Sequence, residues 1–318
     1  STMDGTADEI YANSLSAGQE KNEKLIGKVL SSGHTSVLEH CYVNLSFENV
    51  SVLAEQFLIE FRLASFTVKS RRYVDFSKAG YVSPVFTANV QMAIFERTVE
   101  SLFGTYDVLE AAGVPKEDAR FVLPYCFCSN FFCSMNAREL VHVMNELTYG
   151  RGSRIPELRA LGESLFAQCE QQIPFLAVRK PEAYRQSDAF CLRQVQLLAS
   201  KAPVTVLAAP QDAEGLICGA YQLARGNVPQ PLTKPEQTAL LKVLLAQPRK
   251  RELEQASYTL LFGGLSLAAL THLTRHRMQA LCAPNLLKSA RYDRYVLPES
   301  VQQTGLEAKY REAFWQAG

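Results

Sequence analysis

The sequence predicts an α+β protein in which one strand-and-helix segment occurs twice. Val43, Leu45 and Phe47 alternate with polar residues, as Tyr258, Leu260 and Phe262 do with Ser257 and Thr259, which is the pattern of a strand with one buried face. Apolar residues then recur at every fourth position from Leu53 to Phe61, which is the spacing of one face of a helix. A shift of the sequence by 215 positions superimposes the two strand segments and the residues that follow them.

The repeat covers 25 residues without a gap, 38–62 on 253–277. The identical pairs are Leu38/Leu253, Glu39/Glu254, Leu45/Leu260, Phe47/Phe262, Ser51/Ser266, Ala54/Ala269, Leu58/Leu273 and Arg62/Arg277. Four residues are inserted after Arg277, and the copies then align again, with "SRRYV" (70–74) on "SARYD" (289–293). Agreement in both residue identity and apolar pattern predicts an internal duplication.

The two copies predict two units, residues 1–185 and residues 200–318. In the second unit, residues 203–226 predict a strand, a turn and a helix. The first unit has no matching strand at its start, so we expect an N-terminal strand to be missing from it. The second unit is expected to be truncated, because it ends before any equivalent of residues 120–180. Residues 189–200 predict a helical connector.

Length and charge limit the functions to be considered. The 318 residues are 47% hydrophobic, enough for one large core or two smaller ones. Lysine and arginine number 33 against 32 aspartates and glutamates, so the basic excess of a typical nucleic-acid-binding protein is missing. No apolar run is long enough to span a bilayer, and the first residues lack the pattern of a signal peptide. We therefore expect a cytoplasmic protein that binds neither nucleic acid nor membrane.

The cysteines are expected to be buried thiols in a reducing compartment, because the sequence has no C-x-x-C pair and no secretory signal. They are Cys41, Cys126, Cys128, Cys133, Cys169, Cys191, Cys218 and Cys282. An extended conformation of residues 126–135 would place alternate side chains on one face. These side chains are Phe127, Ser129, Phe131, Cys133 and Met135. Core packing is the favoured interpretation, and no metal site is predicted, because the cysteine spacing suits no common zinc arrangement.

Five short motifs occur in an order that resembles a known family. They are "SGHTSVLEH" (32–40), "SRRY" (70–73), "PKEDARFVLP" (115–124), "MNAREL" (135–140) and the arginine–histidine–arginine triplet at 275–277. Together they resemble the flavin-dependent thymidylate synthases, whose hallmark is such a triplet followed, after seven residues, by a serine. The resemblance covers nearly all of the first copy and the front of the second.

The resemblance implies a fold and a reaction. The family fold is a curved antiparallel sheet packed with long helices, assembled as a tetramer whose sites lie between subunits. The reaction implied is the reductive methylation of dUMP to dTMP, in which methylenetetrahydrofolate supplies the carbon, NADPH supplies the electrons and FAD passes them on. The resemblance also implies that no cysteine nucleophile is needed. This chain is then expected to form a homo-oligomer, a dimer of tandem chains in place of the tetramer.

By this resemblance, three residues would bind the small-molecule substrate dUMP. They are Ser70 and Arg72 in the serine–x–arginine–tyrosine motif and Arg120 in "ARFVLP". Arginine suits the role because its planar guanidinium can pair with two phosphate oxygens at once and stays charged. The alternative for each is an ordinary surface arginine, but together at family positions they favour the nucleotide.

Eight residues would bind FAD by the same resemblance: His34, Ser36, Glu39, Asn136, Arg138, Arg275, His276 and Arg277. Structural roles are compatible with some of them. Ser36 and Glu39 fit a capping box, and Asn136 fits a helix N-cap. The triplet alone would suit a helix C-terminus, where cations complement the helix dipole. Within the repeat we favour binding of a phosphate or of a reduced flavin's negative charge.

The first copy has Glu60, Phe61 and Arg62 where the second copy has the triplet. Glu60 would repel a flavin phosphate and Phe61 has no hydrogen-bonding group, so the first copy is expected to have lost this role. The second copy keeps the triplet but ends before most of the other motifs. Because the losses are complementary, we expect one composite site, with residues 275–277 contributed by the second copy and the remainder by the first.

Some positions depart from the family pattern. Leu147 stands where the family has an arginine on the N3 side of uracil, and Arg151 and Arg154 follow it at a different spacing. His142 replaces an asparagine that contacts flavin, and eleven residues, 278–288, replace the seven-residue spacer. No residue is assigned as catalytic from the sequence.

These observations leave more than one function open. The predicted function is a flavin-dependent thymidylate synthase-like enzyme, with a C5-methylase of another uracil nucleotide as a near alternative. The second alternative is a catalytically lapsed homologue that binds nucleotide or flavin, or that regulates. Retention of complementary motifs in the two copies favours the enzyme, whereas Leu147 favours the lapsed homologue. A nucleic-acid-binding helical protein is disfavoured by the net charge of +1.

Overall fold

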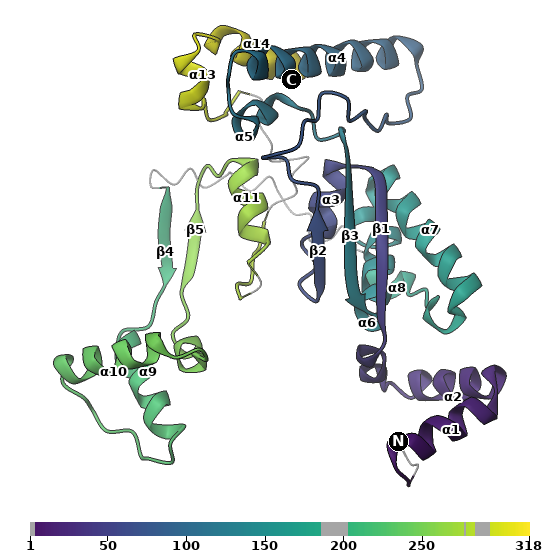
Figure 1. Ribbon diagram of the computed structural model, residues 1–318, viewed down its shortest axis with the longest axis vertical. Coiled ribbons are helices and arrows are strands. Elements are labelled where there is room, and N and C mark those ends of the chain that lie inside the picture. The colour runs from purple at the N-terminus through teal and green to yellow at the C-terminus, as the bar shows by residue number, and fades with distance from the viewer. Residues whose placement is uncertain (1–3, 186–202, 277, 284–292) are drawn as a thin grey trace. The chain divides into compact units, whose positions relative to one another are not determined.

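The computed structural model describes residues 4–185, 203–276, 278–283 and 293–318 (Figure 1). The chain divides into two compact units. The first contains Ser1–Cys191 and Leu270–Gly318, and the second contains Leu192–Ala269. Each unit combines helices with a small antiparallel sheet, so the architecture is mixed α and β, as predicted. The repeat units inferred from sequence are defined by similarity, not by compactness, and they stay a prediction.

The first unit contains an antiparallel sheet with β3 at its centre. Its strands are β1 (Tyr42–Ser51), β2 (Ala64–Val68) and β3 (Cys128–Asn136), in the order β1-β3-β2. Leu45 of β1 and Phe66 of β2 both lie opposite Cys133 of β3. The strand predicted at residues 43–47 is confirmed by β1.

β3 buries every second side chain. Phe127, Phe131 and Met135 are at most 2% exposed, whereas Phe132 is 65% exposed. Phe131 stacks on Phe47 of β1 with ring centroids 4.8 Å apart. The alternation confirms that residues 126–135 place one face in the core.

Helices α6 and α7 cover this sheet and complete its core (Figure 1). The elements after β3 are α6 (Ala137–Thr148), η3 (Arg151–Arg154), α7 (Pro156–Gln172), η4 (Pro174–Leu176) and α8 (Pro181–Tyr184). α6 begins where the side-chain oxygen of Asn136 accepts a 2.9 Å hydrogen bond from the backbone N–H of Glu139. The N-cap predicted at Asn136 is therefore confirmed.

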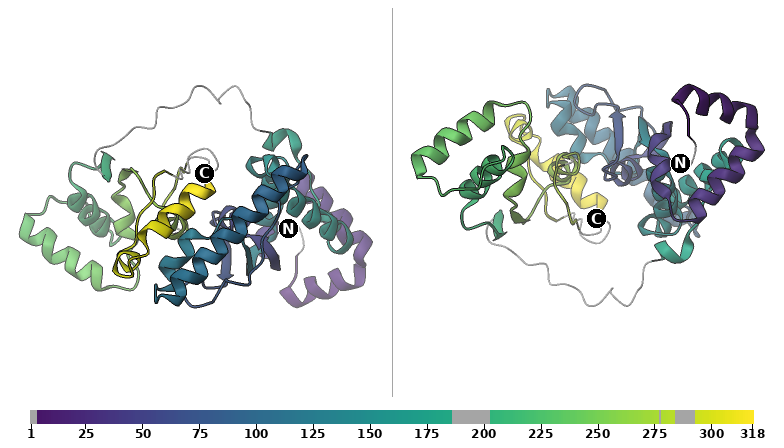
Figure 2. Two further views of the ribbon diagram at one scale, coloured as in Figure 1. Left: turned by 90° about the horizontal axis from the view of Figure 1, so that it is seen from above. Right: turned by 90° about the horizontal axis from the view of Figure 1, so that it is seen from below.

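A second core of the first unit joins helices from distant parts of the sequence. It involves α4 (Asn89–Ala111), α5 (Lys116–Ala119), η2 (Arg120–Val122), α13 (Glu299–Gln303) and α14 (Glu307–Ala317). α4 and α14 lie side by side (Figures 1 and 2), with Tyr106 and Tyr310 at most 1% exposed. α4 has 23 residues, but neither it nor any other described helix is both long and apolar enough to cross a membrane.

One helix in each repeat copy begins with an equivalent hydrogen bond from a backbone N–H to a serine hydroxyl. In α3 (Val52–Leu58) the Ser51 hydroxyl accepts from the N–H of Ala54 at 3.0 Å. In α11 (Leu267–Thr274) the Ser266 hydroxyl accepts from the N–H of Ala269 at 3.2 Å. The helix predicted from the spacing of Leu53, Phe57 and Phe61 is confirmed by α3 as far as Leu58, and Phe61 lies beyond its end.

The second unit is built around a two-stranded antiparallel sheet of β4 (Val204–Ala208) and β5 (Thr259–Phe262). Its other elements are α9 (Ala213–Leu223), α10 (Lys234–Ala246) and η6 (Arg251–Gln255). The strand, turn and helix predicted for residues 203–226 are confirmed by β4 and α9. The connector predicted at 189–200 lies outside the described residues.

The remaining elements precede β1 in the first unit. They are α1 (Ala7–Ala17), α2 (Gln19–Ser31) and η1 (Thr35–His40). α2 and α10 each have 13 residues, and α10 begins 215 positions after α2. The repeat spacing found in the sequence thus recurs in helices outside the aligned segment.

The described cysteines are all free thiols. Cys133, Cys169 and Cys218 are buried, and Cys41, Cys126 and Cys128 are half-buried. Cys282 is exposed, so the prediction of a buried thiol is wrong at that position. Cys191 lies outside the described residues.

The β3 pattern gives a test of the core. Phe131→Ala should lower the free energy of unfolding of the first unit by about 3–5 kcal/mol, because it removes a buried ring from a packed sheet face. Phe132→Ala is the matched control and should change it by less than about 0.5 kcal/mol, because Phe132 faces solvent. Urea denaturation followed by circular dichroism measures both. Equal losses in the two variants would contradict the assigned face.

Candidate functional site

The segment that follows β2 is a turn held against the central strand. The N–H of Lys69 donates to the carbonyl of Asn130 at 3.2 Å, which extends the pairing of β2 with β3. The chain then turns: the N–H of Val74 donates to the carbonyl of Ser70 at 3.1 Å, and that of Arg72 donates to the Ser70 hydroxyl at 3.3 Å. Ser70 and Arg72 therefore occupy a defined loop.

Arg72 and Arg120 meet at Glu117. The Nε of Arg72 pairs with Oε2 of Glu117 at 2.6 Å, and the Nε of Arg120 donates to the Glu117 backbone carbonyl at 3.0 Å. The Arg72 side chain is 54% exposed, so the ion pair itself contributes little to stability. Its consequence is geometric, because one short helix, α5, orients both guanidiniums, of which that of Arg72 is exposed and that of Arg120 is half-buried.

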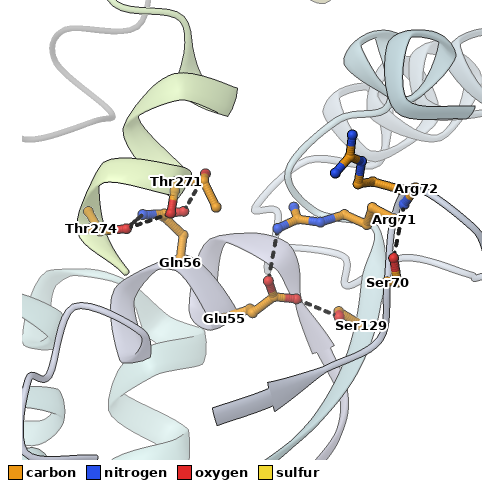
Figure 3. Close-up of polar contacts among 8 residues, drawn as sticks. All are labelled: Glu55, Gln56, Ser70, Arg71, Arg72, Ser129, Thr271 and Thr274. Carbon is orange, nitrogen blue, oxygen red and sulfur yellow. Dashed lines mark hydrogen bonds and ion pairs between the residues drawn. The ribbon is translucent and has the colours of Figure 1, made fainter. Parts of the chain in front are cut away.

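Arg71, between Ser70 and Arg72, points into the protein instead (Figure 3). Its Nη2 pairs with Oε1 of Glu55 at 2.9 Å, and the hydroxyl of Ser129 donates to Oε2 of the same carboxylate at 2.6 Å. The Glu55 side chain is fully buried and that of Arg71 is 12% exposed. Both oxygens of the buried carboxylate are thus paired.

The next residue of α3, Gln56, contacts α11 (Figure 3). Its Oε1 accepts a 2.7 Å hydrogen bond from the hydroxyl of Thr271, and its Nε2 lies 3.5 Å from the hydroxyl of Thr274. Gln56 and Thr271 are both buried. The contact brings the end of α11, with His272 and Arg275, to the same region as Arg71.

Positive charges gather around His272. The pKa of His272 lies below its ordinary value, first because neighbouring atoms exclude water from the imidazole and then because Arg120, Arg275, Arg72 and Arg71 are nearby. The pKa of Arg120 is also lowered, chiefly by burial and next by the charge of Arg71. We call these four arginines and His272 the arginine cluster. A concentration of cations of this kind attracts an anion such as a phosphate.

Other predicted residues lie at the beginning of β1 and the end of β3. Arg138 forms an ion pair with Glu39, and both side chains are about half exposed. His34 and Ser36 are exposed on and beside η1. The capping box predicted for Ser36 and Glu39 is not formed, because η1 is a 3-10 helix without a side-chain cap and Glu39 pairs with Arg138 instead. We call these residues, with Asn136, the Arg138 group.

Among the described residues, the arginine cluster and the Arg138 group lie toward opposite ends of β3. Ser129, which contacts the cluster through Glu55, and Asn136 are seven residues apart on one strand. At the rise of an extended strand this is about 23 Å. His276 is exposed beside Arg275, and Arg277 lies outside the described residues.

The positions that depart from the family pattern form a third, packed group. Glu60 pairs with Nη1 of Arg151 at 3.0 Å. Phe61 is 6% exposed and its ring centroid lies 5.4 Å from that of His142. Leu147 is fully buried in the core that also contains Phe61. We call this group the Phe61 cluster; its side chains are used in contacts with one another.

The model of the family described as "Thymidylate synthase complementing protein" matches residues 3–175. A flavin-dependent thymidylate synthase from Nitratidesulfovibrio vulgaris is 31% identical over 215 residues, which cover 64% of this chain and 79% of that protein. Another, from Geobacter sulfurreducens, is 39% identical over 121 residues, which cover 37% of this chain and 52% of that protein.

The chain belongs to the family of flavin-dependent thymidylate synthases. The family resemblance predicted from the motifs is confirmed. Membership of this family supports the prediction of an enzyme that methylates dUMP and uses a flavin cofactor. Among solved structures, the UMP/dUMP methylase PolB from Streptomyces cacaoi, bound with 5-Br dUMP, is 23% identical, with a TM-score of 0.43 over 52% of this chain and 85% of that one. A TM-score of this size does not establish a shared fold.

Sequence reasoning missed several partners of the arginine cluster. Glu55, Gln56 and Glu117 were not singled out, although Glu55 and Gln56 are polar residues in an otherwise apolar helix, "VLAEQFL". That break in the pattern is the signal that could have identified them, because buried polar groups require partners. Glu117 lies within the "PKEDARFVLP" motif, but its residue type alone does not mark it, since exposed acidic residues are common.

Five of the described cysteines are poorly suited to act as nucleophiles. Burial raises the pKa of Cys126 to about 11 and that of Cys133 to about 12. The pKa values of Cys128, Cys169 and Cys218 are raised by burial as well. Because the thiolate is the reactive form, these thiols are largely unreactive near neutral pH.

The electrostatics of the arginine cluster can be tested through His272. Arg120→Gln should raise the pKa of His272, because it removes the positive charge that contributes most to the neighbouring repulsion. NMR titration of the imidazole signals measures the shift. Arg159→Gln, an exposed arginine on α7, is the matched control and should leave the titration of His272 unchanged. If Arg120→Gln also leaves the titration of His272 unchanged, the side chains of Arg120 and His272 are not neighbours.

Proposed function

We propose that this protein methylates dUMP at C5 to give dTMP, with FAD as its flavin, NADPH as the source of electrons and methylenetetrahydrofolate as the carbon donor. The observation that carries the proposal is the arginine cluster. In a member of this family, Ser70, Arg72 and Arg120 occupy the positions expected to bind dUMP, and the structure gathers them with Arg275 at one accessible place.

We assign the nucleotide phosphate to this cluster. The exposed guanidinium of Arg72 and that of Arg120 would each donate to phosphate oxygens, and the Ser70 hydroxyl lies in the same turn. Glu117 pairs with Arg72 in the free protein and would keep its orientation when the anion binds. Arg275 would approach from α11, so cations from both parts of the repeat would face one phosphate.

The Arg138 group fits the anionic part of a flavin nucleotide by the chemistry of its donors. Arg138 is an accessible cation in the first turn of α6, where backbone N–H groups also favour negative charge. Asn136, Arg138, His34, Ser36 and Glu39 would hold the flavin, with His276 from the second repeat copy, and Arg275 would face both the flavin and the nucleotide phosphate. A bound FAD would supply the electron transfer that converts the carried one-carbon unit into a methyl group.

We further propose that the complete site forms between two copies of the chain. The support is the distance of about 23 Å along β3 between Ser129, which contacts Arg71 of the cluster through Glu55, and Asn136 of the Arg138 group. A second chain that places its Arg138 group beside the arginine cluster of the first chain would bring the predicted site residues together. The expected assembly is a homo-oligomer.

An internal duplication accounts for the spacing of the elements, and we propose it as the origin of the chain. α10 and α11 follow α2 and α3 by 215 positions, and the caps of Ser51 and Ser266 are alike. Gln56 and Thr271, which hydrogen-bond to each other, are also 215 positions apart. Contact between equivalent residues is what a two-fold interface between identical subunits gives.

The lapsed homologue is the less favoured alternative. Its main argument is Leu147, yet Leu147 shares a core with Phe61 of the first repeat copy, and that core contains no residue of the triplet from the second repeat copy. The departures therefore accompany Glu60 and Phe61, where the first copy is expected to have lost its site. We infer that they record the filling of that lost site, and that they leave the arginine cluster intact.

Turnover separates the enzyme from the lapsed homologue. With dUMP labelled with tritium at C5, the protein supplied with FAD, NADPH and methylenetetrahydrofolate should release tritium to water, because methylation replaces the C5 hydrogen. UMP labelled in the same way tests the alternative uracil nucleotide. Flavin and dUMP binding without release from either substrate would establish the lapsed homologue instead.

The assigned phosphate site predicts the effect of losing a guanidinium. Arg72→Gln and Arg120→Gln should each raise the Kd of dUMP about 10-fold to 100-fold, because each removes a charged hydrogen bond to the phosphate. Isothermal titration calorimetry gives the values. Arg159→Gln should bind dUMP as the unaltered protein does. Unchanged Kd values in the first two variants would rule out this cluster as the phosphate site.

The flavin assignment is tested by flavin content. Arg138→Gln and the charge reversal Arg275→Glu should each lower the flavin retained after reconstitution, because each removes a cation assigned to FAD. Absorbance near the flavin band measures it. Retention at the unaltered level in Arg275→Glu would refute a contribution from the second copy.

A further inference from the structure

Two adjacent residues of α3, Glu55 and Gln56, are buried polar side chains in a helix that is otherwise apolar. Glu55 is fully buried and Gln56 is 2% exposed. A charged or amide group in such a place is unfavourable unless it is hydrogen-bonded, so its partners are fixed by the fold. The partners of these two residues lie in different segments of the chain: Arg71 and Ser129 contact Glu55, and Thr271 contacts Gln56.

Glu55 determines where the nucleotide-binding turn lies. Its carboxylate holds Arg71 at 2.9 Å, and Ser129 on the central strand holds the carboxylate at 2.6 Å. Arg71 is flanked by Ser70 and Arg72, so fixing its side chain also fixes the backbone from which those two residues project. The negative charge of Glu55 offsets the positive charge of Arg71. Arg71 can therefore lie close to Arg120, although both are cations.

Gln56 determines where the other side of the cluster lies. Its hydrogen bond with Thr271 joins α3 to the last turn of α11 (Figure 3). Arg275 follows that turn, with the N–H of Arg275 donating to the carbonyl of His272 at 3.3 Å. The position of Arg275 therefore depends on a contact made one residue away from the contact that positions Arg72.

We infer that Glu55 and Gln56 are positioning residues for the anion site, and that α3 sets the separation between Arg72 and Arg275. This inference rests on the proposed function, because it assumes that the arginine cluster binds the phosphate of dUMP. Neither residue touches the nucleotide; they act through Arg71 and Thr271. A change in either should weaken ground-state and transition-state binding alike, which raises KM and leaves kcat nearly unchanged.

The Glu55 side is tested without altering any charge. Ser129→Ala removes the hydroxyl that holds the carboxylate and should raise the KM for dUMP about fivefold, with kcat changed less than about twofold. Ser134→Ala is the matched control on the same strand, because it also removes one side-chain hydrogen bond, that to Asn44. It should leave KM unchanged. Equal KM values in the two variants would overturn the role of Glu55.

The Gln56 side is tested at its partner. Thr271→Val keeps the shape of the side chain but removes the donor to Gln56, and it should also raise the KM for dUMP about fivefold. Thr271→Ser keeps the hydroxyl and should restore the unaltered value. A purely structural role predicts that KM stays constant while the melting temperature falls, so both are measured for each variant. Thr271→Val with an unaltered KM would overturn the role of Gln56.

Arg72→Gln separates failure of this inference from failure of the proposed function. If Arg72→Gln weakens dUMP binding but Ser129→Ala and Thr271→Val do not, the phosphate site stands and the positioning role is wrong. If Arg72→Gln leaves the Kd of dUMP unchanged, the proposed site itself is wrong. Calorimetric titration with dUMP gives this result even for a variant that does not turn over.

Discussion

The site depends on one buried carboxylate. Glu55 has no exposed surface, and it is stable there because Arg71 and Ser129 occupy both of its oxygens. Removal of one partner from a buried ion pair costs about 3–5 kcal/mol, because the other charge is left without compensation. Such a pair adds little net stability compared with apolar packing, but it permits few alternative arrangements. The turn that carries Arg72 is therefore held in one place relative to the central strand.

This constraint matters because the chain assembles like charges. Arg71, Arg72 and Arg120 would repel one another, and Arg275 approaches them from a different part of the sequence. Glu55 pairs with Arg71, which is mostly buried. Glu117 orients Arg72 and Arg120. Arg72 and Arg275 are exposed, and a bound phosphate would balance the positive charge that remains. The fold thus positions these cations before the anion binds.

Much of this architecture could be predicted from the sequence, and the failures have a physical cause. The buried face of β3 and the N-cap at Asn136 follow from local rules of spacing and hydrogen bonding, and both are confirmed. The capping box at Ser36 and Glu39 satisfied the same kind of rule, but Arg138, 99 residues away, takes the carboxylate. Long-range partners of this kind leave no periodic signal. The distance between the two parts of the composite site also could not be predicted from the sequence. The order of the motifs does not show which of them lie near the same end of β3.

The central claim is that guanidiniums from both parts of the repeat bind one phosphate. NMR of arginine Nε–Hε groups during a titration with dUMP tests it directly, because each arginine reports separately. If one phosphate contacts all three, the signals of Arg72, Arg120 and Arg275 move together and give one Kd, while that of Arg159 stays in place. A signal of Arg275 that does not move, or that moves at a different dUMP concentration from Arg72, would contradict it.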